Sequence, residues 1–494
     1  MRRAGILMPI SSIPSRYGIG TFGKASYEFV DFLEKAGQKL WQILPLGPTG
    51  YGDSPYQSFS TFAGNPYYID LELLIDKGYL TREECDAYDF GDDAHYIDYE
   101  KIYLSRFKVL RQAWKRAVEK GIEGKPDYQK FVSDNDYWLE DYALYMAVKN
   151  FFGGVCFLEW DEDIRLRKKK AIARYREKLA EEIAFYRFQQ YLFLTQWKAL
   201  KRYANRKGIE IVGDIPIYVA FDSADTWANP KLFQLDEDGN PIGVAGCPPD
   251  VFATTGQLWG NPLYNWKYHK KTEYEWWVKR IAYCYELYDV VRIDHFRGFE
   301  SYWFVPYGDS TAENGHWEKG PGYGFFSVLK KKLGKKPVIA EDLGFLTDSV
   351  VKLVKKSGYP SMKIVQFAFD AWQDSEYLPH NYGKNCVVYT GTHDNDTTLG
   401  WIKQMPAKDL RFAKQYLQVD SRKELLWGCI RAAVASCADT AIIPIQDYLE
   451  LGSEARINVP STLGLNWKWR MDENALSKEL AKKIRKMMKV YGRL

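Results

Sequence analysis

The sequence predicts an α/β fold, a (β/α)8 TIM barrel with inserted helical and loop subdomains, in which residues 1–494 form a single domain. Two observations predict it. Eight short apolar runs are distributed along the chain, and several are continuous and rich in Val and Ile, as expected of parallel strands buried on both faces. Segments with helical periodicity separate these runs, and eight strands that alternate with helices predict a barrel.

The first two strands are expected at 4–10 and 39–46. Between them, apolar residues recur at the spacing of one helix face, and Gly37 stands where that helix would end. The other six strands are expected at 209–217, 288–296, 337–343, 362–369, 386–393 and 440–448. Further helices are expected at 266–288, 347–356, 408–436 and 473–490, and the last of these would close the barrel.

Two insertions interrupt the alternation of strands and helices. The segment of about 70–180 is rich in charged and aromatic residues with helical period, and it predicts a helical subdomain. The segment of about 221–265 is dense in Pro, Gly, Asn and Asp, and it predicts a region of long loops. Long loops on the upper face of a barrel build its cleft, so we expect 221–265 to be an active-site loop region.

The composition excludes several classes of protein. The formal net charge is only +4, without a large basic region, so no nucleic-acid partner is expected. No apolar run reaches the roughly 18 residues of a membrane span, so no membrane partner is expected either. The seven cysteines are scattered without a CxxC pair, which favours a reducing, cytoplasmic location. The histidines lack the close spacing of a metal site, and neither a metal nor another cofactor is expected.

Acidic residues end three of the expected strands. Asp294 lies in RIDHF, Glu341 in AEDLG and Asp394 in THDND, each after an apolar run. Barrel enzymes present their catalytic groups at the C-terminal ends of different strands. Cleavage of a glycosidic bond needs a carboxylate nucleophile and a carboxylic acid that converge on one sugar. The content of aromatic residues, 16%, also suits the apolar faces of sugar rings. The sequence therefore predicts a sugar-processing enzyme.

The neighbours of two of these acidic residues suggest their roles. Arg292 and His295 flank Asp294, and we expect this cationic environment to favour the ionised form that a nucleophile needs. Glu341 follows an apolar run, where desolvation would raise its pKa as a general acid requires. The alternative for Asp294 is a buried Arg–Asp pair that only stabilises the barrel.

Longer motifs extend the match. The three acidic segments, together with GDIPIYV at 213–219, resemble the four conserved regions of the α-amylase clan. LMPISSIPSRYGIGTFG near the start, QILPLGPTGYGDSPYQSFSTFAGNP at 42–66 and GCPPDVFATTGQLWGNPLYNW at 246–266 resemble the 4-α-glucanotransferases of glycoside hydrolase family 77, the amylomaltases or disproportionating enzymes. The resemblance covers essentially the whole chain. It implies a catalytic barrel without a β-sandwich domain after the last strand, in contrast to most α-amylases.

The resemblance also implies an activity. Segments of α-1,4-glucan, from maltooligosaccharides or amylose, would be transferred to the 4-hydroxyl of glucose or of another glucan. The reaction would be a retaining double displacement through a glucosyl-enzyme ester. Asp294 would be the nucleophile, Glu341 the acid/base and Asp394 the transition-state stabiliser. The protein is expected to be a monomer or a weak homo-oligomer.

Substrate-binding residues follow from the same resemblance. Arg292 would orient the nucleophile, and Trp259 and Phe367 would pack on neighbouring glucose units. The remaining residues of the expected binding set are Ser54, Tyr56, Asp214, Phe252, His295 and His393. In many relatives an aromatic residue follows PPD, where this chain has Val251, with Phe252 next to it. Either Asn458 or Asn466 would reach an acceptor site, and the sequence leaves this choice open.

Two other functions compete with transfer. A hydrolase of the same clan would use the same three carboxylates with water as the acceptor. The 246–260 loop, which would cover the bound glucan, and the match outside the catalytic segments favour transfer. A glucan-binding protein without activity would keep the aromatic residues but could lose the carboxylates, and all three are present.

Overall fold

Eight parallel strands form the centre of the computed structural model, which describes residues 2–50, 52–249, 253–344, 346–370 and 374–494. Their order is β10-β11-β12-β1-β2-β3-β6-β9, and each hydrogen-bonded neighbour is parallel. The strands are β1 (Arg3–Leu7), β2 (Leu40–Gln42), β3 (Glu210–Pro216), β6 (Val290–Asp294), β9 (Val338–Ala340), β10 (Ser361–Ile364), β11 (Cys386–Tyr389) and β12 (Thr440–Pro444). The predicted (β/α)8 fold class is confirmed, and all eight expected strands are present.

The two ends of this sheet meet between β9 and β10. The backbone N–H of Ala340 donates to the carbonyl of Pro360 at 3.0 Å, and the N–H of Met362 donates to Oδ1 of Asp342 at 2.9 Å. These two bonds join the last pair of strands, so the sheet closes into a nearly complete barrel.

Alternation along the strands explains how the barrel is filled. Inward side chains from every strand form one apolar cluster, which includes Leu7, Leu40, Val212, Val290, Ile339, Met362, Val387 and Ile442. The intervening residues, such as Ile6, Ile211 and Val291, belong to a second cluster shared with the surrounding helices. Gly5 is needed where β1 approaches β2, because a Cβ there would lie 2.5 Å from the Cβ of Leu40.

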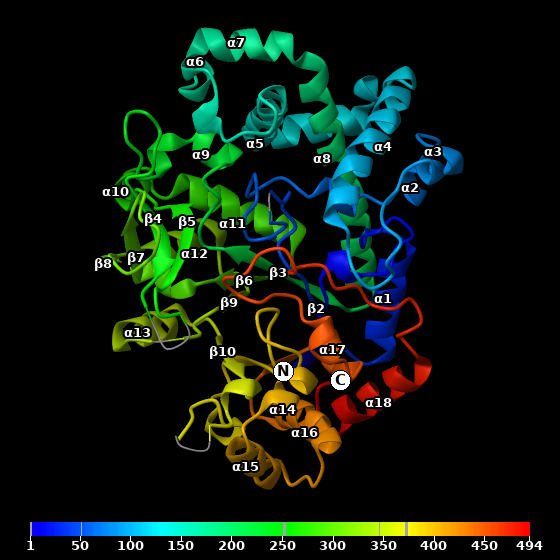
Figure 1. The fold of residues 1–494 in the computed structure, drawn as a ribbon, viewed down its shortest axis with the longest axis vertical. Helices are drawn as coiled ribbons and strands as arrows, with labels where there is room; N and C mark the ends of the chain where they lie inside the picture. Colours follow the sequence, from blue (N-terminus) through cyan, green and yellow to red (C-terminus); the bar gives the residue numbers. More distant parts are fainter. Residues whose placement is uncertain (1, 51, 250–252, 345, 371–373) are drawn as a thin grey trace.

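Helices surround the barrel (Figure 1). The ring includes α1 (Lys24–Lys35), α8 (Ala180–Arg206), α11 (Glu275–Leu287), α12 (Tyr323–Leu333), α13 (Asp348–Ser357), α16 (Arg422–Ala435) and α18 (Lys478–Val490). Glycine in the left-handed region follows two of them, with φ of 71° at Gly37 after α1, as predicted, and 74° at Gly358 after α13. No helix in the described part of the chain is long and apolar enough to cross a membrane.

Several expected elements are shorter than predicted. The run 266–288 divides into α10 (Trp266–Lys271) and α11, because Glu273 and Tyr274 adopt left-handed conformations with φ of 50° and 57°. The run 408–436 divides in the same way into α15 (Ala407–Leu417) and α16, with Gln418 at φ 52°. The last residues of the run 440–448 form α17 (Ile445–Tyr448) instead of continuing β12.

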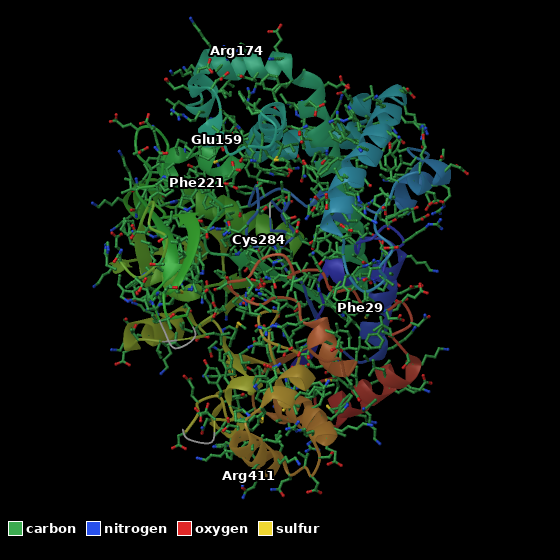
Figure 2. All side chains as sticks on the ribbon, viewed as in Figure 1. Phe29, Glu159, Arg174, Phe221, Cys284 and Arg411 are labelled. Atoms are coloured by element: carbon green, nitrogen blue, oxygen red, sulfur yellow. The ribbon has the colours of Figure 1, made fainter. Side chains whose placement is uncertain are left out.

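The segment between β2 and β3 contributes most of one end of the molecule (Figure 1). Before α8 it contains α2 (Glu72–Asp76), α3 (Arg82–Asp86), α4 (Tyr99–Glu119), α5 (Pro126–Phe151), α6 (Glu162–Arg165) and α7 (Lys169–Lys178). Both α4 and α5 pack on α8. Arg174 on α7 and Arg411 on α15 mark opposite ends of the molecule in Figure 2.

A second sheet lies beside the barrel, and the sequence analysis missed it. It is antiparallel, in the order β5-β4-β7-β8, and consists of β4 (Gly243–Cys247), β5 (Gln257–Pro262), β7 (Ser301–Pro306) and β8 (His316–Lys319). The segment 221–265 therefore contains two strands, as well as α9 (Ala224–Ala228), in addition to loops. The sequence of β4, GVAGC, is short and contains two glycines, and it pairs with β7, which lies beyond β6 in the chain.

Candidate active site

The three acidic residues predicted from the sequence lie after strands of the barrel. Asp294 is the last residue of β6, Glu341 directly follows β9, and Asp394 lies in the loop that follows β11. Since β6 pairs with β9 in the register Ile293 to Ala340, Asp294 and Glu341 occupy neighbouring positions at the C-terminal end of the barrel. This is the end at which barrel enzymes carry their active sites.

Both oxygens of the Glu341 carboxyl accept hydrogen bonds from the backbone. The N–H of His295 donates to Oε2 and the N–H of Leu343 donates to Oε1, each at 2.7 Å. Burial raises the pKa of Glu341 to about 7, and the negative charge of Asp294 adds to this rise. The prediction of a raised pKa for Glu341 is confirmed, and the group is suited to donate a proton near neutral pH.

Asp294 shares a buried guanidinium with a second carboxylate. Nη2 of Arg292 lies 3.0 Å from Oδ1 of Asp294, while Nη1 lies 2.7 and 2.6 Å from the two oxygens of Asp214. The side chains of Arg292 and Asp214 are 3% and 0% exposed. Asp214 and Arg292 are direct partners in the register of β3 and β6, so the ion pair is a cross-strand pair inside the barrel.

The expected cationic environment of Asp294 is a prediction that the structure corrects. Burial raises the pKa of Asp294 to about 6, and the negative charges of Asp214 and Asp394 oppose the charge of Arg292. His295 adds no positive charge, because burial lowers its pKa to about 3. Asp294 is therefore harder to ionise than an ordinary aspartate.

Asp394 is held by residues that follow the last strand of the barrel. Nδ2 of Asn458 donates to Oδ1 of Asp394 at 2.6 Å, and Nη2 of Arg456 donates to its backbone carbonyl at 2.7 Å. Nε2 of His393 lies 3.4 Å from Oδ2 of the same carboxylate. Asn466, the other candidate, instead accepts from the N–H of Val459 at 2.9 Å. Asn458 is thus the one of the two that contacts the carboxylates.

Aromatic rings line the site on two sides. The ring of Tyr56 stacks on His393, with centroids 5.1 Å apart and planes 15° apart, and its hydroxyl donates to Oδ2 of Asp214 at 3.0 Å. Trp467 lies against both rings, 5.8 and 6.0 Å away. On the other side, Trp259 meets the ring of His295 edge-on at 4.7 Å.

Two buried ring nitrogens in this wall are candidates to contact a ligand. Nε2 of His295 and Nδ1 of His393 are buried and have no hydrogen-bond partner among the residues that the structure describes. Buried polar atoms are usually paired, so these two atoms are suited to the hydroxyl groups of a polyhydroxylated ligand.

The structure does not bring the whole predicted binding set to the carboxylates. Phe367 is 42% exposed and its ring contacts Tyr377 edge-on at 5.4 Å. Oγ of Ser54 accepts from the N–H of Tyr56 at 3.3 Å, so its visible role is to shape the turn that carries Tyr56. Phe252, like Val251, lies outside the described residues.

Two residues and one contact of the site were missed by the sequence analysis. Arg456 and Trp467, and the contact of Asn458 with Asp394, come from the segment between α17 and α18. This segment has neither strand nor helix periodicity, and no spacing pattern in it points to a ligand site. A search for polar and aromatic residues in the segment that follows the last barrel strand could have found them.

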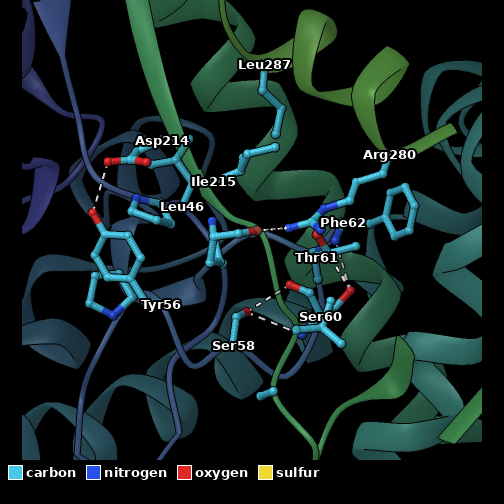
Figure 3. Close-up of a pocket in the computed structure, with 18 of the residues that line it drawn as sticks. Leu46, Tyr56, Ser58, Ser60, Thr61, Phe62, Asp214, Ile215, Arg280 and Leu287 are labelled. Carbon is cyan, nitrogen blue, oxygen red and sulfur yellow. Dashed lines mark hydrogen bonds between the residues drawn. The ribbon is translucent and has the colours of Figure 1, made fainter. Parts of the chain in front are cut away.

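A small cavity is lined in part by Tyr56 and Asp214 (Figure 3). Its volume is about 50 Å³, and Leu46, Ser58, Thr61, Ile215 and Arg280 are among the residues that line it. This is enough space for a few water molecules and too small for a sugar ring. Arg280 closes one side by donating from Nη1 to the carbonyl of Ile217 at 2.9 Å, which fixes the chain beyond β3.

Comparisons with known proteins agree with this geometry. A model of the 4-alpha-glucanotransferase family, glycoside hydrolase family 77, matches residues 8–476. The chain is 52% identical to a 4-alpha-glucanotransferase of Clostridium butyricum over 98% of this chain and 100% of the relative. It is 45% identical to one of Thermus thermophilus over 100% and 99% of the two chains. Among solved structures, the amylomaltase of Streptococcus agalactiae in complex with acarbose superposes with a TM-score of 0.96 at 41% identity, covering 100% of both chains.

Proposed function

From the premise that this chain belongs to the 4-alpha-glucanotransferases of glycoside hydrolase family 77, we propose that Asp294, Glu341 and Asp394 carry its reaction. The reaction of the family is the transfer of α-1,4-glucan segments from a donor to an acceptor. What remains to be assigned is the role of each residue, and the hydrogen bonds and charges of the site support a specific assignment.

The first half of the reaction forms a covalent intermediate. Glu341 donates its proton to the glycosidic oxygen while a carboxylate oxygen of Asp294 attacks C1 of the donor sugar. The C1–oxygen bond breaks, the leaving chain departs with the proton, and a glucosyl ester of Asp294 remains. In the second half, Glu341 removes the proton from the 4-hydroxyl of the acceptor, whose oxygen displaces Asp294 from C1. Two inversions at C1 give net retention.

The single observation that carries this assignment is the contact of Asp294 with Arg292, whose Nη2 lies 3.0 Å from Oδ1 of Asp294. A guanidinium at this distance favours the ionised form that a nucleophile needs, and it leaves one carboxylate oxygen oriented. Burial raises the pKa of Glu341, and the negative charge of Asp294 raises it further. An ionised Asp294 therefore favours a protonated Glu341, which is the state that the first step requires.

The surrounding residues support binding of one sugar ring. We assign the buried ring nitrogens of His295 and His393 to sugar hydroxyls, and Tyr56 with Asp214 to the wall beneath that ring. Asp394 would stabilise positive charge at the anomeric carbon. Trp259 would pack on a neighbouring glucose unit, and Phe367, at its exposed position, on a more distant one. The amylomaltase of Streptococcus agalactiae holds acarbose, which is a further reason to expect an α-glucan ligand here.

The sharpest test of the roles uses a donor that needs no acid catalyst. Fluoride leaves an α-maltosyl fluoride without protonation, so Glu341→Ala should lose most activity on maltotriose but retain glycosylation by the fluoride. Asp294→Ala should lose both, because the ester cannot form. If Asp294→Ala reacts with the fluoride as fast as Glu341→Ala does, and with retention at C1, Asp294 is not the nucleophile.

Transfer to glucose or another glucan is the proposed fate of the ester. Incubation with maltotriose should give glucose together with maltopentaose and longer chains, with little net increase in reducing ends. Glucose and maltose with increasing reducing ends, and no longer chains, would assign the acceptor as water and make the chain mainly a hydrolase.

Location and domain organisation are further parts of the proposal. Buried thiols such as Cys85, Cys284, Cys386 and Cys429 are consistent with a reducing cytoplasm. We propose that the insertions of about 70–180 and 221–265 belong to the same catalytic domain. We also propose that the protein is a monomer or a weak homo-oligomer. Sedimentation at several protein concentrations would test the oligomeric state.

A further inference from the structure

We infer that Asp447 is a positioning residue, which holds in place the loop that carries His393 and Asp394. The inference rests on the roles proposed above for His393 and Asp394. The loop runs from Thr390, directly after β11, to Thr398, the first residue of α14 (Thr398–Gln404). Asp447 lies in α17, directly after β12, so it belongs to the neighbouring unit of the barrel.

One carboxylate holds both ends of this loop. Oδ2 of Asp447 accepts from the hydroxyl of Thr390 at 2.5 Å and from the hydroxyl of Thr398 at 2.7 Å. Its Oδ1 accepts from the backbone N–H of Thr398 at 2.8 Å. The three bonds therefore join Thr390 and Thr398, which are eight positions apart, to the carboxylate of Asp447.

Asp447 and its two threonine partners are buried. Asp447 is 1% exposed, and Thr390 and Thr398 are each 0% exposed. A buried donor left without an acceptor carries a desolvation cost, so each of these hydrogen bonds is costly to lose. The ends of the loop are consequently held more firmly than water-exposed bonds would hold them.

Bonds within the loop transmit this constraint to Asp394. Oδ1 of Asn395 accepts from the N–H and the hydroxyl of Thr392 at 2.8 and 2.9 Å, and the N–H of Asp394 donates to the hydroxyl of Thr392 at 3.3 Å. Gln366 donates from Nε2 to the carbonyl of Asp396 at 2.9 Å. The loop is thus a small rigid unit, and a change at its ends would displace His393 and Asp394 together.

Asp447 itself is separated from the site that binds substrate. The hydrogen bonds of its carboxylate, within the described part of the chain, go to Thr390 and Thr398, and the residue is almost wholly buried. Its effect on the reaction must therefore pass through the loop. Misplacement of a catalytic group by about 1 Å can cost about 100-fold in rate.

The chain contains a matched control for this pair. The hydroxyl of Thr21 donates to Oδ2 of Asp70 at 2.6 Å, and Oδ1 of Asp70 accepts from the N–H of Leu73 at 3.0 Å. Thr21 is 3% and Asp70 5% exposed. As at Asp447, a buried carboxylate accepts from a threonine hydroxyl and from a backbone N–H, but here the bonds join the loop after β1 to the start of α2, neither of which carries a catalytic carboxylate.

The test compares isosteric substitutions at the two sites. Thr390→Val removes the hydroxyl donor, and we expect kcat on maltotriose to fall about 10- to 100-fold, with a smaller increase in KM because His393 moves with Asp394. Thr390→Ser keeps a donor and should restore most of kcat. Thr21→Val should lower Tm comparably but leave kcat within about twofold. Asp447→Ala and Asp70→Ala, where both fold, should show the same contrast.

A double substitution separates this inference from the proposed function. If Asp447 and Thr390 act partly through Asp394, Thr390→Val should lower kcat by a clearly smaller factor in an Asp394→Asn background than in the unsubstituted protein, and the remaining loss would pass through His393. Equal losses of kcat in Thr390→Val and Thr21→Val, or full additivity with Asp394→Asn, would overturn the positioning role. Near-normal activity of Asp394→Asn itself would instead overturn the proposed assignment of Asp394.

Discussion

The backbone N–H of His295 donates a 2.7 Å hydrogen bond to Oε2 of Glu341. The N–H of Phe296 donates in turn to the carbonyl of Glu341 at 3.0 Å, and the N–H of Glu341 donates to the carbonyl of Ile293 at 3.1 Å. The residues on either side of Asp294 and the residue Glu341 are therefore tied backbone to backbone. The relative placement of the two groups is set by this short turn, more than by the side chains around them.

The first prediction concerns the conformation of this turn. His295 has φ 53° and ψ 49°, in the left-handed region, where a side chain costs about 1–2 kcal/mol. Asn tolerates this region and β-branched residues do not. We expect His295→Val to lose roughly 1–2 kcal/mol more of the free energy of unfolding than His295→Asn, as measured by urea denaturation. Equal stability of the two variants would show that the turn has another conformation.

The second prediction concerns the contact between Asn458 and Asp394. Asn458→Ala removes the 2.6 Å bond to Oδ1 of Asp394, and we expect kcat to fall about tenfold, the scale of one hydrogen bond to a charged group. Asn458→Asp replaces the donor by a second carboxylate, which would repel the carboxylate of Asp394. The loss should therefore be larger for Asn458→Asp than for Asn458→Ala.

Asn466 provides the control for this comparison. Its amide bonds to Val459 and Thr462 instead of the carboxylate. Asn466→Asp should change stability more than it changes kcat. A loss of kcat in Asn466→Asp equal to that in Asn458→Asp would contradict the assignment of Asn458 to Asp394.

The barrel could be predicted because buried parallel strands leave a direct mark in the sequence. Runs such as 337–343 and 386–393 begin with several consecutive apolar residues, and Glu341 and Asp394, which follow these residues, stand out against them. The strand of 243–247 left no such mark, since it is short, contains two glycines and finds its partner in 301–306. Pairing between distant segments is not encoded in local periodicity.

The charge at Asp294 could not be predicted for a related reason. Neighbours in sequence, Arg292 and His295, suggested a positive environment. The partner that neutralises Arg292 is Asp214, which lies across the strand pair and about eighty positions earlier. Burial also keeps His295 neutral. Both effects depend on the closed barrel and are invisible in a linear reading.

The third prediction concerns the buried pair of Asp214 and Arg292. The side chain of Arg292 is only 3% exposed. In Asp214→Asn, its guanidinium would keep Asp294 as its charged partner. Breaking a buried ion pair by removing one partner costs about 3–5 kcal/mol, and we expect a loss near the lower end of this range because Asp294 remains. Urea denaturation measures this loss. A loss below about 1 kcal/mol, which is the range of an exposed ion pair, would contradict the prediction.

The same substitution should shift the pH dependence of the reaction. The negative charge of Asp214 raises the pKa of Asp294, so removing it lowers this pKa. Asp294 would then stay ionised to lower pH, and the acidic limb of kcat/KM should move to lower pH in Asp214→Asn, even if kcat itself is reduced. A shift to higher pH would mean that Arg292 had moved away from Asp294.

The last prediction is a narrow bell-shaped dependence of kcat/KM on pH. Asp294 must be ionised to attack, and its pKa is about 6, so activity falls as the pH decreases below that value. Glu341 must be protonated to act as acid, and its pKa is about 7, so activity falls as the pH increases above that value. The two limbs belong to the coupled pair and report macroscopic values. With α-maltosyl fluoride as donor, the first step no longer needs the acid, so the alkaline limb of glycosylation should disappear while the acidic limb remains. Initial rates for both donors over the same pH series measure this, and an alkaline limb that persists with the fluoride would assign that ionisation to a group other than the acid.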